Sequence, residues 1–323
     1  MSRYDESDAR IRPGRNKTRP RSKDRPQHDS TPAFVIAVDR GRFTTIVDDG
    51  APSERQVYAI KARELGRKGV VVGDRVGLVG DITGHTDTLA RLVSIEERAS
   101  LLRRTADDTD TTERAIVANA DQVLIVQALA DPPARIRFID RCIIAAKDEG
   151  ITPILVLTKS DLADDSAVRE IYRDIELEIF TVNPTENISQ LAAAVAGKVS
   201  VVIGHSGVGK STLVNRLVPD ADRLTGDVND VTGRGRHTST SAVALKLPKG
   251  GWIIDTPGVR SFGLGHIDPT HLIEFFPDLV PGEEFCPRAC SHNESECGLP
   301  QWVEQEGISP NRLDSLHRLL TSM

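Results

Sequence analysis

The hydrophobic pattern first separates two regions of the chain by their periodicity. Residues 33–79 hold short runs rich in β-branched residues, separated by Gly, Asp and Pro, with almost no helical spacing. Such runs predict a small five-stranded barrel, of which the OB-fold is the commonest kind. Barrels of this type often bind oligonucleotides, and a purely structural appendage is the alternative. The predicted strands are residues 33–38, 43–47, 56–60, 69–72 and 75–79.

From about residue 120, apolar runs alternate with segments of helical spacing, which predicts a largely parallel sheet covered by helices on both faces. The strands are expected at residues 121–127, 154–157, 178–182, 199–203, 241–247 and 252–254. The helices are expected at residues 135–148, 166–175, 188–196 and 211–217, with a further C-terminal helix at 311–320.

These patterns predict a multidomain protein with four parts. Residues 1–32 are rich in Arg, Pro, Ser and Asp and predict a disordered basic arm. An OB-fold-like barrel follows at residues 33–100, an α/β P-loop domain at 101–265 and a small helical domain at 266–323.

Charge is unevenly distributed along the chain. The net charge is −6, but residues 1–25 carry a net +5 and the remainder −11. A basic arm on an acidic body can hold phosphate through counterion release, and a solvated tail is the equal alternative. The chain has no run of eighteen apolar residues and no apolar segment at its charged N-terminus. We therefore expect a cytoplasmic protein without membrane contact.

A phosphate-binding loop is the first motif that carries chemistry. Residues 204–211 match G-x-x-x-x-G-K-[ST] between a predicted strand and a predicted helix. Backbone N–H groups and the helix N-terminus favour phosphate, Lys210 is expected to reach the β- and γ-phosphates, and Ser211 to bind Mg²⁺. The nucleotide-binding residues expected from this segment are Gly204, His205, Ser206, Gly207, Val208, Gly209, Lys210, Ser211 and Thr212.

A second motif points to the base. Thr158, Lys159, Ser160 and Asp161 follow a predicted strand and are similar to the N-K-x-D guanine motif, with Thr158 in place of Asn. The Asp161 carboxylate can accept two hydrogen bonds from guanine, and adenine lacks that pair of donors. The threonine keeps one hydroxyl for the neighbouring loop, so a reduced affinity for the nucleotide is expected.

A third motif resembles the D-x-x-G switch. Asp255 is expected to hold Mg²⁺ through a water molecule, and the Gly258 N–H to contact the γ-phosphate. In the segment before it, Thr238 is the expected second Mg²⁺ ligand, with Thr240 as the alternative. Neither Val259 nor Arg260 supplies a water-orienting Gln, so slow unassisted turnover is expected.

His237 is therefore the nearest titratable candidate for positioning the attacking water, and a partner that orders its segment is the alternative. As catalytic residues we expect Lys210, His237 and Thr238.

The order of the motifs is unusual. The guanine motif comes first, then the phosphate loop and then the switch motif, which indicates a circular permutation. With residues 69–75, the segment 235–238 and the Cys/His cluster near the C-terminus, this order resembles the RsgA/YjeQ family of ribosome-dependent GTPases. The resemblance implies a GTPase that binds GTP and GDP and the small ribosomal subunit with its rRNA, is stimulated by it, and acts in late subunit maturation. We expect a monomer.

The cluster comprises Cys286, Cys290, His292 and Cys297. Three thiolates and one imidazole suit one structural, tetrahedral Zn²⁺ with no open position, which the resemblance also implies; reduced free thiols are the alternative. Cys142 lies among isoleucines on a predicted helix and is expected to be a buried apolar residue. Two other functions stay open, namely an RNA-binding protein that uses GTP as a conformational ligand, and a P-loop ATPase or small-molecule kinase.

Overall fold

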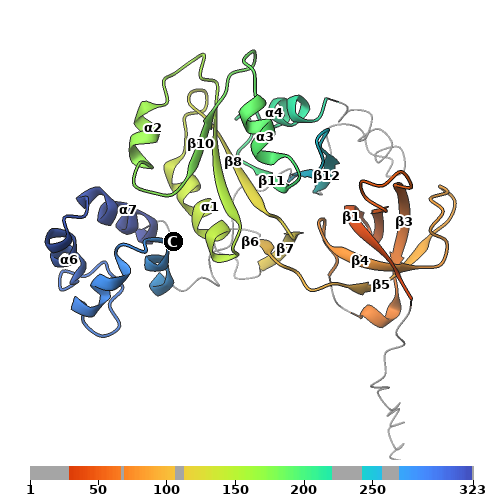
Figure 1. Cartoon of the computed structure of the whole chain (residues 1–323), viewed down its shortest axis with the longest axis horizontal. Helices are drawn as coiled ribbons and strands as arrows, with labels where there is room; N and C mark the ends of the chain where they lie inside the picture. The colour runs from red at the N-terminus through yellow and green to blue at the C-terminus, as the bar shows by residue number, and fades with distance from the viewer. Residues whose placement is uncertain (1–28, 67–68, 106–112, 220–241, 257–268, 322–323) are drawn as a thin grey trace, which may run out of the picture.

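The chain forms three parts in a row, a barrel, a central α/β part and a C-terminal helical part (Figure 1). The structure is a computed structural model that describes residues 29–66, 69–105, 113–219, 242–256 and 269–321. Residues 1–28, which make up nearly all of the predicted basic arm, lie outside the described residues. None of the described helices is long and apolar enough to cross a membrane.

The barrel closes through five strands in the order β1-β2-β3-β5-β4, with β4 returning to β1. This is the closed order of the OB-fold. The predicted strand at residues 69–72 is wrong, because that stretch makes only a single bridge, from Val72 to Val117. The strands are β1 (Thr31–Asp39), β2 (Arg42–Val47), β3 (Arg55–Lys61), β4 (Arg75–Val79) and β5 (Ala90–Ile95), with the short helix η2 (Arg63–Leu65) after β3.

The turn that precedes β4 explains why residues 69–72 are not a strand. The buried Asp74 carboxylate accepts a hydrogen bond from the Val71 N–H at 2.8 Å and two from the Arg98 guanidinium at 2.7 and 2.9 Å. Backbone groups that would pair with a neighbouring strand are thereby held in a turn. Arg98 in turn fixes the segment that leaves the barrel towards the α/β part.

A two-stranded sheet, β6 (Leu101–Thr105) and β7 (Glu113–Ala118), lies between the barrel and the central sheet and was not predicted. Its polar residues gather at 103–105 and 113–114, so the strands lack the apolar alternation that a sequence pattern would reveal. Asn119 ties this hairpin to the barrel, because its side chain accepts from the Ala99 N–H and donates to the Gly73 carbonyl.

The central sheet has the strand order β10-β9-β8-β11-β13-β12, parallel except for β12. Its strands are β8 (Gln122–Ala128), β9 (Thr152–Thr158), β10 (Glu178–Thr181), β11 (Val199–Ile203), β12 (Val243–Lys246) and β13 (Trp252–Asp255). Its helices are α1 (Ile136–Asp148), α2 (Ser166–Ile171), α3 (Ser189–Val195) and α4 (Lys210–Leu217). The predicted α/β alternation is confirmed, although α2 stops four residues before the predicted end.

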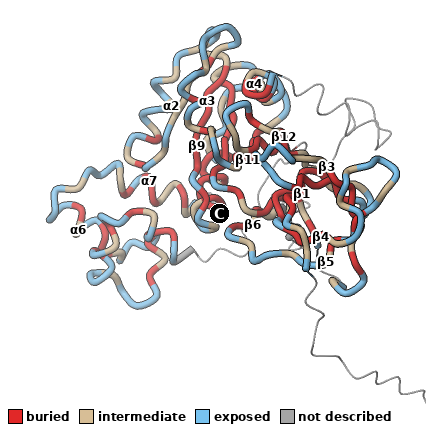
Figure 2. The backbone as a smooth tube through the Cα atoms, turned by 45° about the vertical axis from the view of Figure 1, so that its right-hand side comes forward, coloured by how far each residue is buried: buried red, intermediate tan, exposed pale blue. Residues whose placement is uncertain are grey.

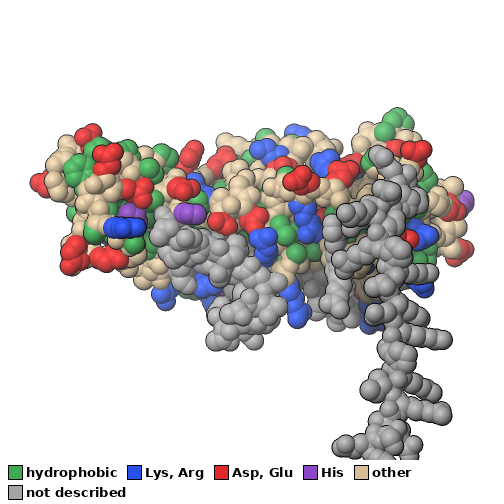
Figure 3. Space-filling model, turned by 90° about the horizontal axis from the view of Figure 1, so that it is seen from below, with side chains coloured by type: hydrophobic (Ala, Val, Ile, Leu, Met, Phe, Trp, Pro, Cys, Tyr) green, Lys and Arg blue, Asp and Glu red, His purple; other side chains and the backbone are tan. Residues whose placement is uncertain are grey.

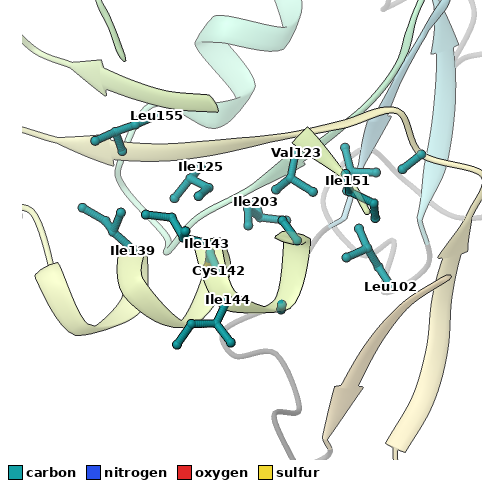
Figure 4. Packing of buried hydrophobic residues seen from close by; sticks show 14 of the residues in the cluster. Leu102, Val123, Ile125, Ile139, Cys142, Ile143, Ile144, Ile151, Leu155 and Ile203 are labelled. Carbon is teal, nitrogen blue, oxygen red and sulfur yellow. The ribbon is translucent and has the colours of Figure 1, made fainter. Parts of the chain in front are cut away.

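Alternation along the buried strands divides the apolar side chains between two cores. On β8, Val123 and Ile125 belong to the core that includes α1, whereas Leu124 and Val126 belong to the core that includes α3 and α4. Successive side chains of a strand point to opposite faces, so a fully apolar strand serves both. Figure 4 shows Ile125, Leu155 and Ile203 of the sheet above Ile139 and Ile143 of α1, and Figure 2 shows the buried strands of the sheet.

The barrel joins the central part through the hairpin of β12 and β13. Strand β1 pairs with β12 at Ala37 and Val243, and Asp49 accepts hydrogen bonds from Lys246 and from the Trp252 indole, both at 2.9 Å. Burial disfavours ionisation of Asp49, but these hydrogen bonds outweigh it and lower the pKa of the carboxyl. The hairpin is therefore held by charged hydrogen bonds as well as by backbone pairing.

The C-terminal part contains η3 (Pro269–Phe275), η4 (Val280–Phe285), α6 (Leu299–Glu306) and α7 (Pro310–Thr321), which matches the predicted final helix. Helix α7 packs on the central part through Arg318, which pairs with the fully buried Asp140 at 3.3 Å. Asp140 also accepts a hydrogen bond from the Tyr172 hydroxyl at 3.0 Å. A buried carboxylate with these partners holds the C-terminal part against α1.

Candidate functional site

The three nucleotide motifs meet at one edge of the central sheet. Strands β8, β9, β11 and β13 are parallel neighbours, so their carboxyl ends lie side by side. The register places Asp255 of β13 beside Val202 of β11, and Thr158 of β9 beside Ala128 of β8. Ligands of open α/β sheets bind at this edge.

The phosphate-binding loop follows β11 and turns into α4. Gly204 has φ +151°, and a Cβ there would lie 2.3 Å from the Val126 carbonyl oxygen, so a side chain would clash with β8. Gly209 adopts a left-handed conformation, φ +91°, as the N-cap of α4. These glycines let the backbone pass close to β8 and expose the N–H groups at the start of α4.

Lys210 is the first residue of α4, and its side chain folds over the loop. Its Nζ donates to the carbonyls of Gly204 at 2.7 Å and His205 at 2.8 Å. Burial lowers the pKa of Lys210, and the nearby Asp255 carboxylate partly offsets this effect. The ring of His205 packs against Phe138 of α1, with 4.4 Å between centroids, which fixes one side of the loop.

Asp255 ends β13 next to this loop. Its Oδ1 is buried, and within the described residues it has no hydrogen-bond partner. Burial raises the pKa of the Asp255 carboxyl, and the Lys210 charge opposes that rise. A buried carboxylate oxygen without a donor fits a cation or its bound water as partner. The donor set therefore fits the Mg²⁺ ion that Ser211 and Asp255 were predicted to hold.

Thr158 joins the guanine motif to the phosphate-binding loop. Its buried hydroxyl donates to the Val208 carbonyl at 2.6 Å and lies 3.3 Å from the Gln127 carbonyl. The expectation that a threonine here keeps a hydrogen bond to the loop is confirmed. One hydroxyl therefore connects the carboxyl ends of β8 and β9 with the loop after β11.

A pocket of about 100 Å³ lies beside this contact. Its walls come from the guanine motif, from the segment after β10 and from α4. Lys159 lines the first wall, and its Nζ donates to the Asp131 carbonyl. Asp161 is exposed in the turn after β9 and does not line the pocket, although it stands three residues from Thr158.

Four predicted site residues lie outside the described residues, namely His237, Thr238, Thr240 and Gly258. The described residues thus bring the guanine motif, the phosphate loop and Asp255 together, while the proposed water-positioning and second Mg²⁺-binding groups stay predictions.

Three residues at or near the sites were missed by the sequence analysis. Arg216 of α4 lines the pocket, Asp131 accepts the Lys159 hydrogen bond, and Glu283 lies 3.6 Å from His292 Nε2. Glu283 stands three residues before Cys286, so proximity to the cysteine motif was an available signal. Arg216 and Asp131 carry no motif of their own, and only the fold reveals them.

The predicted metal ligands do come together. Ligand atoms of Cys286, Cys290, His292 and Cys297 all lie within 4.8 Å of one another. The Cys286 Sγ lies 3.8 Å from the Cys297 Sγ and 3.7 Å from the His292 Nδ1. A tetrahedral ion with bonds of about 2.3 Å to sulfur separates two such sulfurs by about 3.8 Å. The cluster thus has the spacing that a metal site requires, whereas Cys142 is a buried apolar residue as expected.

Comparisons with known proteins agree with this geometry. Residues 95–265 match the family model described as RsgA GTPase. The protein named Small ribosomal subunit biogenesis GTPase RsgA from Klebsiella pneumoniae (strain 342) is 36% identical over 270 residues, covering 79% of this chain and 76% of that protein. Its namesake from Haemophilus influenzae (strain 86-028NP) is 38% identical over 220 residues, which cover 65% of this chain and 63% of that protein, less than two thirds of its length.

Two solved structures share the architecture. The structure of YjeQ from Thermotoga maritima has a TM-score of 0.65 and 25% identity, covering 90% of this chain and 97% of that one. The structure of YloQ, described as a circularly permuted GTPase, has the same TM-score and 23% identity, covering 93% and 97%. The described architecture of this chain is therefore that of these two structures.

Thr158→Val is expected to weaken GDP binding about fivefold to tenfold, because it removes the hydroxyl that bonds the Val208 carbonyl. Thr158→Ser keeps the hydroxyl and is expected to bind nearly as the unaltered protein does. Equilibrium binding of a fluorescent GDP analogue measures both. Equal affinity of the Val and Ser variants would show that the Thr158 contact contributes nothing.

Proposed function

The chain belongs to the RsgA GTPase family, and we propose that it hydrolyses GTP to GDP and phosphate while bound to the small ribosomal subunit during late maturation of that subunit. The observation that carries the nucleotide assignment is the hydrogen bond from Thr158 to the phosphate loop, since it joins the base-reading and phosphate-binding motifs. The names of the matched relatives support the ribosomal part.

Recognition of guanine rests on the guanine motif. The exposed Asp161 carboxylate is free to accept the N1–H and 2-amino donors of the base, which adenine does not offer as a pair. Lys159, anchored on the Asp131 carbonyl, borders the pocket into which the base fits. Thr158, Lys159, Ser160 and Asp161 are thus proposed as the base-binding residues.

In the proposed reaction, water attacks the γ-phosphorus and the bond to the β–γ bridging oxygen breaks, which releases phosphate and GDP. Residues 204–212 hold the phosphates, and Lys210 exchanges its carbonyl partners for phosphate oxygens. Ser211 would hold Mg²⁺ directly and Asp255 would hold it through a water molecule, and the ion would supply charge compensation. Gly258, Thr238 and His237 keep the γ-phosphate, Mg²⁺ and water roles that the sequence predicts for them.

On the face seen in Figure 3, Lys and Arg side chains of the described residues lie among Asp and Glu side chains. We propose that the barrel and the basic arm together contact rRNA of the small subunit, that the protein acts as a monomer, and that it works in the cytoplasm, where it would meet that subunit. The charge of the arm supports phosphate contact.

GTP turnover with and without purified small ribosomal subunits tests the proposed function. We expect the subunit to raise turnover at least about tenfold, because no switch Gln orients the water in the free protein. Lys210→Ala is expected to abolish turnover, and Lys198→Ala, just before the start of β11, to leave it unchanged.

Measurable turnover that the subunit does not stimulate would contradict the ribosomal partner, but the proposed GTP hydrolysis would still stand. Tight GTP binding without turnover under either condition would instead favour an RNA-binding protein that uses GTP as a conformational ligand. Wild-type turnover in Lys210→Ala would contradict the role of the phosphate loop.

The metal in the cysteine cluster is proposed to be Zn²⁺, held by Cys286, Cys290, His292 and Cys297 without an open position. Three sulfur ligands and one nitrogen favour zinc among the common structural ions. Glu283 beside His292 Nε2 fits the carboxylate that often orients a ligating imidazole.

Elemental analysis of the purified protein is expected to find about one zinc per chain, as a closed four-ligand site requires. The double variant Cys286→Ser, Cys290→Ser should lose the metal and have a lower melting temperature. The single variant Cys142→Ser should keep the metal. A folded, metal-free protein, or retention of zinc by the double variant, would refute the zinc site.

A further inference from the structure

The base pocket depends on a residue outside every recognised motif. We propose that Arg216 is a positioning residue for guanine, because it fixes the segment after β10 that forms one wall of the pocket. Arg216 lies near the end of α4 and lines the pocket itself. This proposal rests on the proposed function, since it assigns a role in reading the base.

The guanidinium donates hydrogen bonds to the segment after β10 at two points. Arg216 Nη1 donates to the Asn183 carbonyl at 2.5 Å, and Nη2 donates to the Glu186 carbonyl. No ion pair among the described residues involves Arg216, so its hydrogen-bonding capacity is directed at backbone carbonyls. A planar guanidinium can hold two separate carbonyls at fixed spacing, whereas an ammonium group acts as a point charge.

The segment at residues 182–186, which Arg216 contacts, is a compact turn. The Asn183 side-chain oxygen accepts from the backbone N–H groups of Thr185 at 2.9 Å and Glu186 at 2.7 Å. At the start of the segment, the Val182 N–H donates to the Leu157 carbonyl at 2.8 Å. The turn is thus hydrogen-bonded within itself and to β9, and Arg216 joins it to α4.

The position of this turn matters because Asn183 and Pro184 line the pocket together with Thr158 and Lys159 of the guanine motif. Discrimination between bases depends on polar groups held in fixed places, since a loose wall accommodates either base edge. Arg216 also stands six residues after Lys210 on the same helix. It therefore ties the base-binding wall to the element that begins at the phosphate loop.

A merely structural role and a positioning role predict different results. Loss of helix α4 would weaken all ligands of the phosphate loop alike. Loss of the wall alone would weaken guanine nucleotides more than adenine nucleotides, and would leave pyrophosphate binding unchanged. The ratio of the ADP to the GDP dissociation constant therefore separates the two roles.

The test measures binding of GDP, ADP and pyrophosphate by calorimetry to the full chain and to Arg216→Ala, Arg216→Lys and Arg173→Ala. Arg173 of the α2 region is the matched control, because it is half exposed, pairs with Glu170 and Asp174, and does not line the pocket. We expect Arg216→Ala to weaken GDP about tenfold, with ADP and pyrophosphate changed less than about twofold.

Arg216→Lys is expected to recover only part of the GDP affinity, and Arg173→Ala to bind like the unaltered chain. An unchanged ratio, an equal loss for all three ligands, or full recovery by Arg216→Lys would overturn the positioning role. If Arg216→Ala does not fold, the ratio of the ADP to the GDP dissociation constant is measured with Arg216→Lys and Arg216→Gln instead. A wild-type chain that does not prefer GDP over ADP would contradict the guanine assignment itself, not the role of Arg216.

Discussion

Everything in the candidate site depends on the parallel pairing of β9, β8, β11 and β13. Parallel neighbours end at the same edge, so three motifs that are about fifty residues apart in the chain become adjacent in space. The chain order of the motifs is then irrelevant to the chemistry, because only the strand order decides which loops meet. A circular permutation preserves the site for this reason.

The same sheet also connects the site to both flanking parts. The β12–β13 hairpin ends in Asp255 at the nucleotide edge and carries Lys246 and Trp252, which bind Asp49 of the barrel. On the other side, Asp140 of α1 holds Arg318 of the C-terminal helix. Both flanking parts are therefore attached to elements of the nucleotide-binding part through partly or fully buried charges.

Much of this architecture was predictable from the sequence. Apolar strands that feed two cores, such as β8, and the glycines of the phosphate loop leave strong local signals, and the four metal ligands lie within twelve residues. The apolar stretch at 69–72 was mistaken for a barrel strand because only the fold shows that Asp74 holds it in a turn, and the strand at 90–95 was missed. The hairpin of β6 and β7 gave no apolar alternation.

Contacts made by ordinary residues through tertiary structure could not be predicted. From the sequence, Arg216 is expected to be a surface arginine on a short helix. Only the packing of α4 against the segment after β10 brings it to two backbone carbonyls. Asp131 contributes its backbone carbonyl, a group that every residue carries, so its identity holds no information. Thr158, by contrast, was recognised by its place in a motif, and the fold supplied its partner.

The central claim is that the motif at residues 158–161 reads guanine at this sheet edge. The most direct measurement compares binding of GDP and xanthosine diphosphate to the full chain and to Asp161→Asn by calorimetry. Guanine pairs its 2-amino and N1–H groups with a carboxylate, whereas xanthine carries a carbonyl oxygen in place of the 2-amino group and pairs better with an amide. We expect the variant to lose GDP affinity at least about tenfold and to gain xanthosine diphosphate affinity. Unchanged GDP affinity in Asp161→Asn would contradict the account.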